Sequence, residues 1–151
     1  TLPTATLSRA AYRYGEPELG FAMLCHVADT LEAGSIGLFH ELIPEGACIV
    51  QLWSAATFVR GVVEDLLGIQ VDAPGHSLRV APRPPAGWGT VELENLVFGE
   101  HCVSLRVEPG RLWAASQAGA APLKIHFTFT AGGQAGAVLA PGEQVILEQP
   151  A

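Results

Sequence analysis

Two carboxylates, Glu41 and Glu45, stand four residues apart in the stretch from Phe39 to Ala56, and no lysine or arginine lies between them. Paired carboxylates serve glycoside hydrolysis, because one protonates the leaving oxygen while the other activates water or attacks the sugar. Glutamates in an acidic protein are also ordinary surface residues. Spacing alone therefore leaves a catalytic and a surface interpretation open for both residues.

The same stretch ends where Gln51, Trp53 and Ser54 begin a predicted helix. The free N–H groups and the positive dipole end of a helix start could hold an oxygen-rich ligand or orient a nearby carboxylate. The alternative is that Ser54 caps the helix and Trp53 packs in the core. His40, next to Glu41, is either a hydrogen-bonding group for a substrate or a solvated loop residue.

The sequence gives little support for a metal site or for a catalytic serine. The adjacent pairs Cys25-His26 and His101-Cys102 lack the spacing of metal ligands, and neighbouring residues on a strand point to opposite faces. No Gly-x-Ser-x-Gly motif surrounds Ser54, which disfavours a serine nucleophile. We therefore predict no metal and no cofactor.

Two tryptophans in the second half of the chain, Trp88 and Trp113, allow two interpretations. Together they could form a platform on which a sugar stacks. A tryptophan that follows a Pro-Gly crossing is, however, more often a packing residue.

The composition of the chain disfavours some classes of binding partner. A formal net charge of −7, with eight scattered Lys and Arg, argues against nucleic acid and against an anionic membrane surface. No apolar run approaches the roughly 20 residues of a bilayer-spanning helix. With 49% hydrophobic and 15% charged residues and a mean hydropathy of +0.31, the chain favours surfaces that a partner covers. Three cysteines without paired spacing indicate reduced thiols and a cytoplasmic setting.

The pattern of apolar residues divides the chain into a helical and a β half. Helical spacing occurs over residues 4–14, 17–33 and about 52–67, and a loop of about fifteen residues, long for a helical bundle, separates the last two segments. On the third segment Arg60 and Glu64 form an i,i+4 pair opposite an apolar stripe. The stripe consists of Leu52, Ala55, Ala56, Val59, Val62, Val63 and Leu66.

After Gly68 the apolar residues alternate, which predicts five or six antiparallel strands with a bulge or break near Asn95. The proline-rich stretch 81–89 cannot be a central strand. Helices followed by strands predict an α+β fold. We place a helical domain at residues 1–70 and an antiparallel β-sandwich-like domain at 71–151.

Several short motifs follow one another along residues 1–108 and resemble one known family. They are Leu2-Pro3, Ala10-Ala11-x-x-Tyr14-Gly15, Glu41-Leu42, Cys48-x-x-Gln51-Leu52-Trp53-Ser54-Ala55-Ala56, Leu66-Leu67-Gly68-x-x-x-Asp72-Ala73-Pro74-Gly75, Leu78-x-Val80-x-Pro82-x-Pro84 and Trp88. This series resembles the C-terminal end of bacterial amylo-α-1,6-glucosidases, which are glycogen-debranching-type glycoside hydrolases built on an (α/α)6 toroid. The resemblance fades beyond Gly110.

The resemblance implies a fold and a site. The helices would be the last three of an incomplete (α/α)6 toroid, followed by the small β-sandwich domain of the family. The family's catalytic base, a glutamate in a Pro-Glu-Leu-Phe-like loop, falls on Glu41, although His40 replaces the proline and Ile43 the phenylalanine. Glu45 is the alternate base. Gln51, Trp53 and His40 would bind the sugar.

The resemblance also implies what the chain lacks. A toroid needs about twelve helices, and the family's general acid lies on an upstream segment. We therefore expect the C-terminal part of a glycosidase of carbohydrate metabolism, acting on an oligosaccharide or polysaccharide by inversion and inactive alone. Its apolar helical faces would pack on an upstream toroid segment, on a companion chain, or on a second copy. The alternative is a non-catalytic structural or carbohydrate-binding module that could form a homodimer.

Overall fold

The chain forms two compact units in a computed structural model that describes residues 1–33, 37–43, 48 and 50–150. The helical unit comprises Thr1–Leu67 together with Arg83–Ala86. The β unit comprises Gly68–Pro82 and Gly87–Ala151. The chain thus enters the β unit, returns to the helical unit for four residues, and then completes the β unit.

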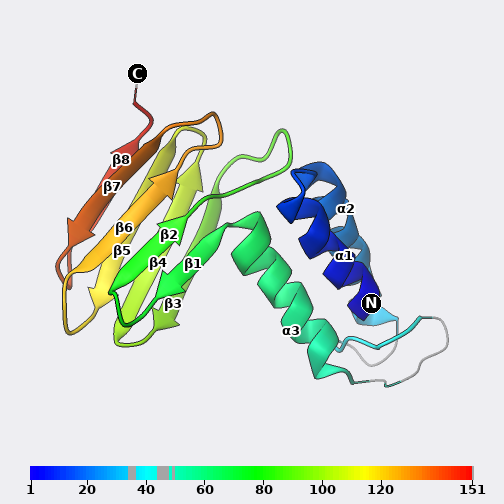
Figure 1. Cartoon of the computed structure of the whole chain (residues 1–151). Coiled ribbons are helices and arrows are strands. Elements are labelled where there is room, and N and C mark those ends of the chain that lie inside the picture. The colour runs from blue at the N-terminus through cyan, green and yellow to red at the C-terminus, as the bar shows by residue number, and fades with distance from the viewer. Residues whose placement is uncertain (34–36, 44–47, 49, 151) are drawn as a thin grey trace. The chain divides into compact units, whose positions relative to one another are not determined.

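The helical unit begins with a hairpin of α1, Leu2–Arg13, and α2, Pro17–Ala28, which continues into the 3-10 turn η1, Asp29–Glu32 (Figure 1). The two helices approach closely at Gly20. A Cβ atom built there would lie 2.6 Å from the Tyr12 ring, so glycine is required at this crossing. Only Tyr14, Gly15 and Glu16 connect the two helices, so they pack as an antiparallel pair (Figure 1).

The third predicted helix is continuous but changes its winding. It consists of α3, Leu52–Arg60, followed by a π-helical segment η2, Gly61–Leu66. The first half of its apolar stripe lies at the surface, with Leu52 78% exposed and Val59 55% exposed, whereas the polar side chains of Ser54 and Asp65 are buried. Ala55 and Phe58 pack inward and Leu66 is buried, so this helix has apolar residues on the inside and also an exposed apolar patch at Leu52 and Val59.

No helix within the described ranges is both long enough and apolar enough to cross a membrane.

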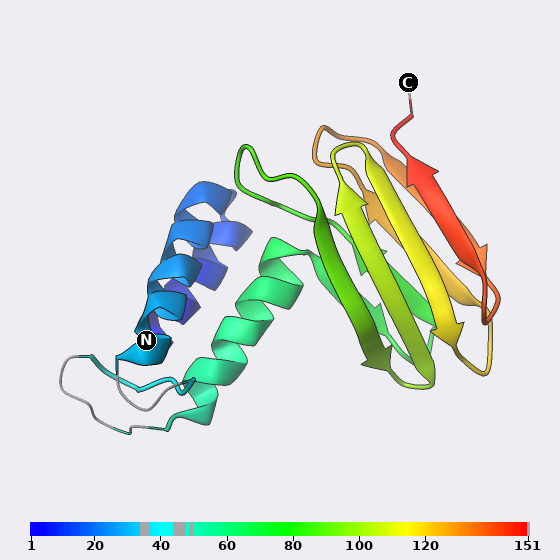
Figure 2. The ribbon, with the colours of Figure 1, turned by 180° about the vertical axis from the view of Figure 1, so that it is seen from behind.

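The β unit contains two four-stranded sheets stacked face to face (Figures 1 and 2). Sheet A has the order β1-β2-β6-β7, and sheet B has the order β3-β4-β5-β8. The strands are β1 Ile69–Asp72, β2 Ser77–Val80, β3 Val91–Phe98, β4 His101–Glu108, β5 Arg111–Ala118, β6 Leu123–Thr128, β7 Gln134–Leu139 and β8 Gln144–Glu148.

The inner faces of the two sheets form the core of this sandwich, because alternate residues of each strand point inward. Sheet B pairs Leu105 with Ala114 and Val107 with Leu112 on this face. The buried residues include Ile69, Leu78, Val80, Ile125, Phe127 and Leu139 from sheet A and Val103, Leu105, Leu112, Ala114 and Leu147 from sheet B.

The α+β fold class, with helices first and a β-sandwich after them, is confirmed. The structure has eight strands in its described part, where five or six were expected, and one pairing differs: β2 and β6 run parallel. The expected bulge is present between Leu93 and Leu96, where Asn95 adopts a left-handed φ of 56°. No strand lies between Ala81 and Thr90, as the prolines there predicted.

Candidate functional site

The start of α3 is held against the preceding loop by a buried hydroxyl. Ser54 Oγ lies 3.0 Å from Thr1 Oγ1 and 3.2 Å from the backbone oxygen of His40, and it also hydrogen-bonds to Gln51 Oε1. Ser54 is fully buried. It therefore links the loop to the helix, and it is not the N-cap, because Gln51 occupies that position without a side-chain capping bond.

The backbone of Glu41, the predicted base, is fixed by this arrangement. Its nitrogen donates to Cys48 O at 3.3 Å, and its oxygen accepts from the nitrogen of Thr1 at 2.9 Å. Its neighbours are held as well, since Gln51 N donates to Phe39 O at 2.8 Å. The Glu41 residue is half-buried.

The alternate base, Glu45, lies outside the described residues, so the separation of the two carboxylates has no structural description. The role of each carboxylate stays a prediction.

The three predicted sugar-binding residues occupy different environments. His40 and Gln51 are buried beside Ser54, and His40 Nε2 has no hydrogen-bond partner among the described residues. Such a buried unpaired nitrogen is uncommon in folded proteins. Trp53 is 74% exposed, so the alternative that it packs in the core is wrong. The structure thus brings His40 and Gln51 together and leaves the indole of Trp53 on the surface.

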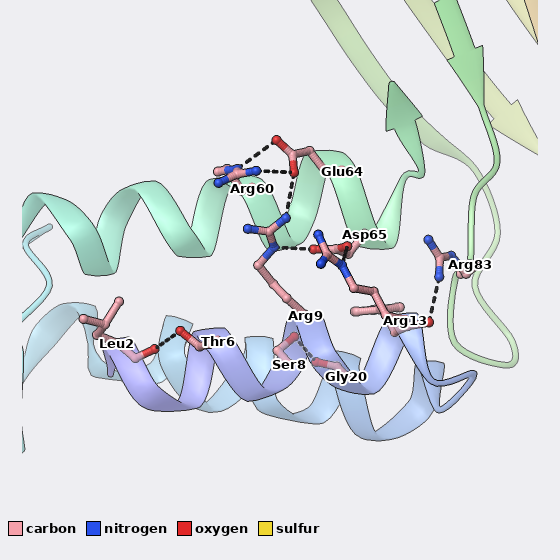
Figure 3. A network of polar contacts seen from close by, with 11 residues as sticks. Leu2, Thr6, Ser8, Arg9, Arg13, Gly20, Arg60, Glu64, Asp65 and Arg83 are labelled. Carbon is pink, nitrogen blue, oxygen red and sulfur yellow. Dashed lines mark hydrogen bonds and ion pairs between the residues drawn. The ribbon is translucent and has the colours of Figure 1, made fainter. Parts of the chain in front are cut away.

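An ion-pair network joins α1 to the end of the third helix (Figure 3). Arg9 Nε lies 2.6 Å from Asp65 Oδ2, and Arg9 Nη2 lies 2.7 Å from Glu64 Oε2. Arg60 Nε lies 2.8 Å from Glu64 Oε1, which confirms the i,i+4 pair. The hydrogen bonds from Arg60 hold the pKa of Glu64 below its usual value. The ion pair of Arg9 with Glu64 could not be predicted from the sequence, because helical and strand periodicities do not relate residues that are 55 positions apart.

A buried tyrosine completes this unit. Burial raises the pKa of Tyr12 to about 12, although the nearby Arg83 acts in the opposite direction. Arg83 Nη1 donates to the Tyr12 backbone oxygen at 2.7 Å, and its guanidinium lies 5.9 Å from the centre of the Tyr12 ring. These contacts attach the segment 83–86 to the helical unit.

The remaining candidates lie in the β unit. Trp113 is half-buried on β5, and Trp88 lies in the segment between β2 and β3. His101 is buried on β4, with Nε2 2.9 Å from Nδ1 of His76. Within the described residues, no three His, Cys, Asp or Glu side chains gather closely enough to hold a metal ion.

Comparison with known proteins places the chain near one group of carbohydrate-active enzymes. Residues 72–128 match the family model described as glycosyl hydrolase family 65, C-terminal domain. A solved structure described provisionally as a kojibiose phosphorylase from the human microbiome has a similar fold, with a TM-score of 0.62 and 12% sequence identity. No curated protein matches the chain.

The two similarities cover only part of the proteins that are compared. The match to the solved structure covers 97% of this chain but only 17% of that chain, and at 12% identity it shows the fold alone. Together with the family match, it supports a glycoside hydrolase-family C-terminal domain in which helices precede a β-sandwich. Neither similarity points to amylo-α-1,6-glucosidases in particular.

Proposed function

We propose that this chain is the C-terminal part of a toroid-type enzyme that cleaves α-glucosidic or related linkages, with the β unit as its terminal domain. The observation that carries the proposal is the match of residues 72–128 to the C-terminal domain of glycosyl hydrolase family 65. The similar solved structure, of which this chain covers 17%, supports the idea that such a unit belongs to a longer protein.

The surface of α3 supports the same proposal. Leu52 and Val59 are seven residues apart and so lie on one face of the helix, and both are more than half exposed. Contiguous exposed apolar side chains mark a surface that a partner covers. Further toroid helices would bury them, whether these helices are upstream in the same chain or belong to a companion chain.

Within that enzyme we assign the general base to Glu41, with Glu45 as the alternate. The base would remove a proton from the attacking water while a general acid from the upstream helices protonates the leaving oxygen, which inverts the anomeric centre. Of the three predicted sugar-binding residues, the exposed Trp53 would contact the sugar, whereas the buried His40 and Gln51 would hold the loop and the helix start through Ser54. The hydrogen bonds that hold the Glu41 backbone to Cys48 and Thr1 support this assignment, since a base must be held in position.

The test uses the full product of the gene that encodes these residues. Hydrolysis of α-linked disaccharides is measured for the wild type, Glu41→Gln and Glu45→Gln, with and without inorganic phosphate. We expect Glu41→Gln to lower kcat by about 10²- to 10⁴-fold with an unchanged circular dichroism spectrum, and Glu45→Gln to have little effect. The phosphate arm is included because the similar solved structure is described as a phosphorylase.

Two results would contradict the assignment. Near-wild-type turnover of Glu41→Gln would remove Glu41 from catalysis. Turnover that occurs only with phosphate would show that no water is activated, so that a water-activating base has no role.

The second candidate is a non-catalytic structural or carbohydrate-binding module that could form a homodimer. The exposed stripe on α3 also favours this reading, because a second copy could cover it. Analytical ultracentrifugation of the 151-residue chain separates the two proposals. A stable dimer of defined mass that Leu52→Ser dissociates would favour the module, whereas a monomer or an aggregate of no defined mass would favour the enzyme fragment.

A further inference from the structure

The outer face of sheet B carries a depression of about 650 Å³. We call it the sheet B trough and define it by six of its lining residues: Glu94, Asn95, Ser104, Arg106, Trp113 and Gln117. They come from β3, β4 and β5, three adjacent strands of one antiparallel sheet. A depression that holds an aromatic ring and several polar side chains has the make-up of a ligand site.

The bulge in β3 shapes one wall of the trough. Between Leu93 and Leu96 the register with β4 shifts, because two residues of β3, Glu94 and Asn95, lie opposite the single residue Ser104 of β4. Asn95 takes a left-handed φ of 56°, a conformation that asparagine tolerates better than most residues, and its nitrogen donates to Ser104 Oγ at 3.2 Å. Bulges commonly re-aim side chains near functional sites.

Small and polar side chains form the floor of the sheet B trough. Ser104 pairs in register with Ala115, so two small side chains face each other at the centre of the sheet. Gln117 Nε2 donates to Ser104 Oγ at 3.0 Å, and Gln117 Oε1 accepts from Cys102 Sγ at 3.0 Å. These bonds hold the Gln117 amide in one orientation, which prepares it for hydrogen bonding at low entropic cost.

Trp113 supplies the apolar surface. It lies on the outer face opposite Arg106 in register, and its indole Nε1 donates to Gln144 Oε1 at 3.3 Å. That bond restrains the ring while the residue stays half-buried. A restrained, partly exposed indole offers a flat apolar face beside polar groups.

The charges around the trough disfavour an anionic ligand. Arg106 lies 2.8 Å from Glu108 and 3.5 Å from Glu92, and Arg111 lies 4.0 Å from Glu108. Carboxylates thus already neutralise both arginines. Glu94 lies in the same trough and has no ion-pair partner among the described residues. A phosphate or nucleic acid would meet more negative than available positive charge.

We infer that the sheet B trough binds a neutral oligosaccharide, with one sugar ring stacked on Trp113 and its hydroxyls hydrogen-bonded to Gln117, Asn95 and Glu94. A sugar ring has apolar C–H faces and a rim of hydroxyls that both donate and accept, which matches an indole beside amide and carboxylate groups. The choice of a saccharide rests in part on the proposed function, whereas the trough itself does not.

The test is an NMR titration of the ¹⁵N-labelled 151-residue chain with maltotetraose, and in parallel with cellotetraose. The indole N–H signal of Trp113 is identified by its absence from the Trp113→Phe spectrum. We expect this signal and the side-chain amide of Gln117 to shift with saturation. Trp113→Ala should weaken binding at least tenfold, Gln117→Ala should weaken it less, and Trp113→Phe should keep most of it.

The matched control is Val138→Ala, which removes an exposed apolar side chain from β7 in the other sheet. It should bind as the wild type does. The inference is overturned if neither saccharide shifts the Trp113 signal at about 20 mM, if Trp113→Ala binds normally while folded, or if the signal responds only to the concentration of the chain itself, which would reveal a protein contact. Binding to the 151-residue chain, together with no hydrolysis by the full gene product, would retain this inference and remove the proposed function.

Discussion

Replacing Arg9 with methionine should destabilise the helical unit far more than the same change at Arg13. Both arginines lie near the carboxylate of Asp65, but Arg9 contacts it at 2.6 Å with a side chain 13% exposed, whereas Arg13 contacts it at 4.0 Å and is 67% exposed. Asp65 itself is 5% exposed. Without Arg9 this carboxylate stays in the interior with only a distant, solvated cation.

The size of the effect follows from that burial. Removing one partner of a buried ion pair costs about 3–5 kcal/mol, and removing an exposed one costs about 0–1 kcal/mol. For a unit of this size, each kcal/mol lowers the thermal midpoint by roughly 4–8 °C. Arg9→Met should therefore lower the midpoint by more than about 10 °C, and Arg13→Met by no more than about 8 °C.

The assay is thermal unfolding followed by circular dichroism at 222 nm, which reports mainly on the helices. A double variant, Arg9→Met with Asp65→Leu, serves as the rescue, because it removes the stranded charge along with its partner and should recover most of the loss. Equal midpoints for Arg9→Met and Arg13→Met, or a double variant no more stable than Arg9→Met, would refute the argument from burial.

Two further predictions concern pH. Because hydrogen bonds from Arg60 lower the folded pKa of Glu64 beneath its usual 4.5, the stabilisation is present above that pH and is lost as the pH falls through the folded value. The difference in urea midpoint between the wild type and Glu64→Gln should therefore be larger at neutral pH than in acid, and a constant difference would contradict it. The raised pKa of Tyr12, about 12 against 10, means that stability falls as the pH rises from 10 to 12, since the unfolded chain ionises first. Alkaline unfolding curves of Tyr12→Phe should lack this part of the fall.

The strands of the β unit were largely predictable, because a period of two survives in the sequence wherever one face is buried. β4 alternates Val103 and Leu105 inward with Ser104 and Arg106 on the other face, whereas β5, with Trp113 and Ala115 on its outer face, was not predicted. The parallel pairing of β2 with β6 was not predictable, since no local pattern states which distant strand completes a sheet.

The helical unit shows a different limit. The period of α3 predicted an apolar stripe, and the stripe exists, but its first half faces solvent while Ser54 and Asp65 face inward. Hydrophobic periodicity predicts which residues share one face of a helix, but it does not predict whether that face is buried or exposed in this chain. The polar interior depends instead on Arg9, whose partners are more than fifty residues away in the sequence.

The candidate sites, like the fold, were predictable only in part. Gln51 was predicted at the helix start, and the structure places His40 beside it through Ser54; their role in binding a sugar stays a prediction. The sheet B trough was missed apart from Trp113, because its wall depends on the bulge at Asn95 and its floor on a cross-strand pair of small residues. The sequence shows the break in alternation near Asn95 and the small residues Ser104 and Ala115. It does not show which strands pair or in what register, so it could not predict that these residues form a depression.

The pairing of β2 with β6 also sets an order of folding. The β1–β2 hairpin is complete at residue 80, but its parallel neighbour begins only at Leu123, so sheet A cannot close until the chain has made β3, β4 and β5. A pairing across so long a loop forms slowly, whereas the adjacent hairpins of sheet B form from local contacts. The β3–β4–β5 part of sheet B should therefore be the template on which sheet A is assembled, and β8 joins it last. During synthesis the β1–β2 hairpin must wait with an open edge until β6 leaves the ribosome.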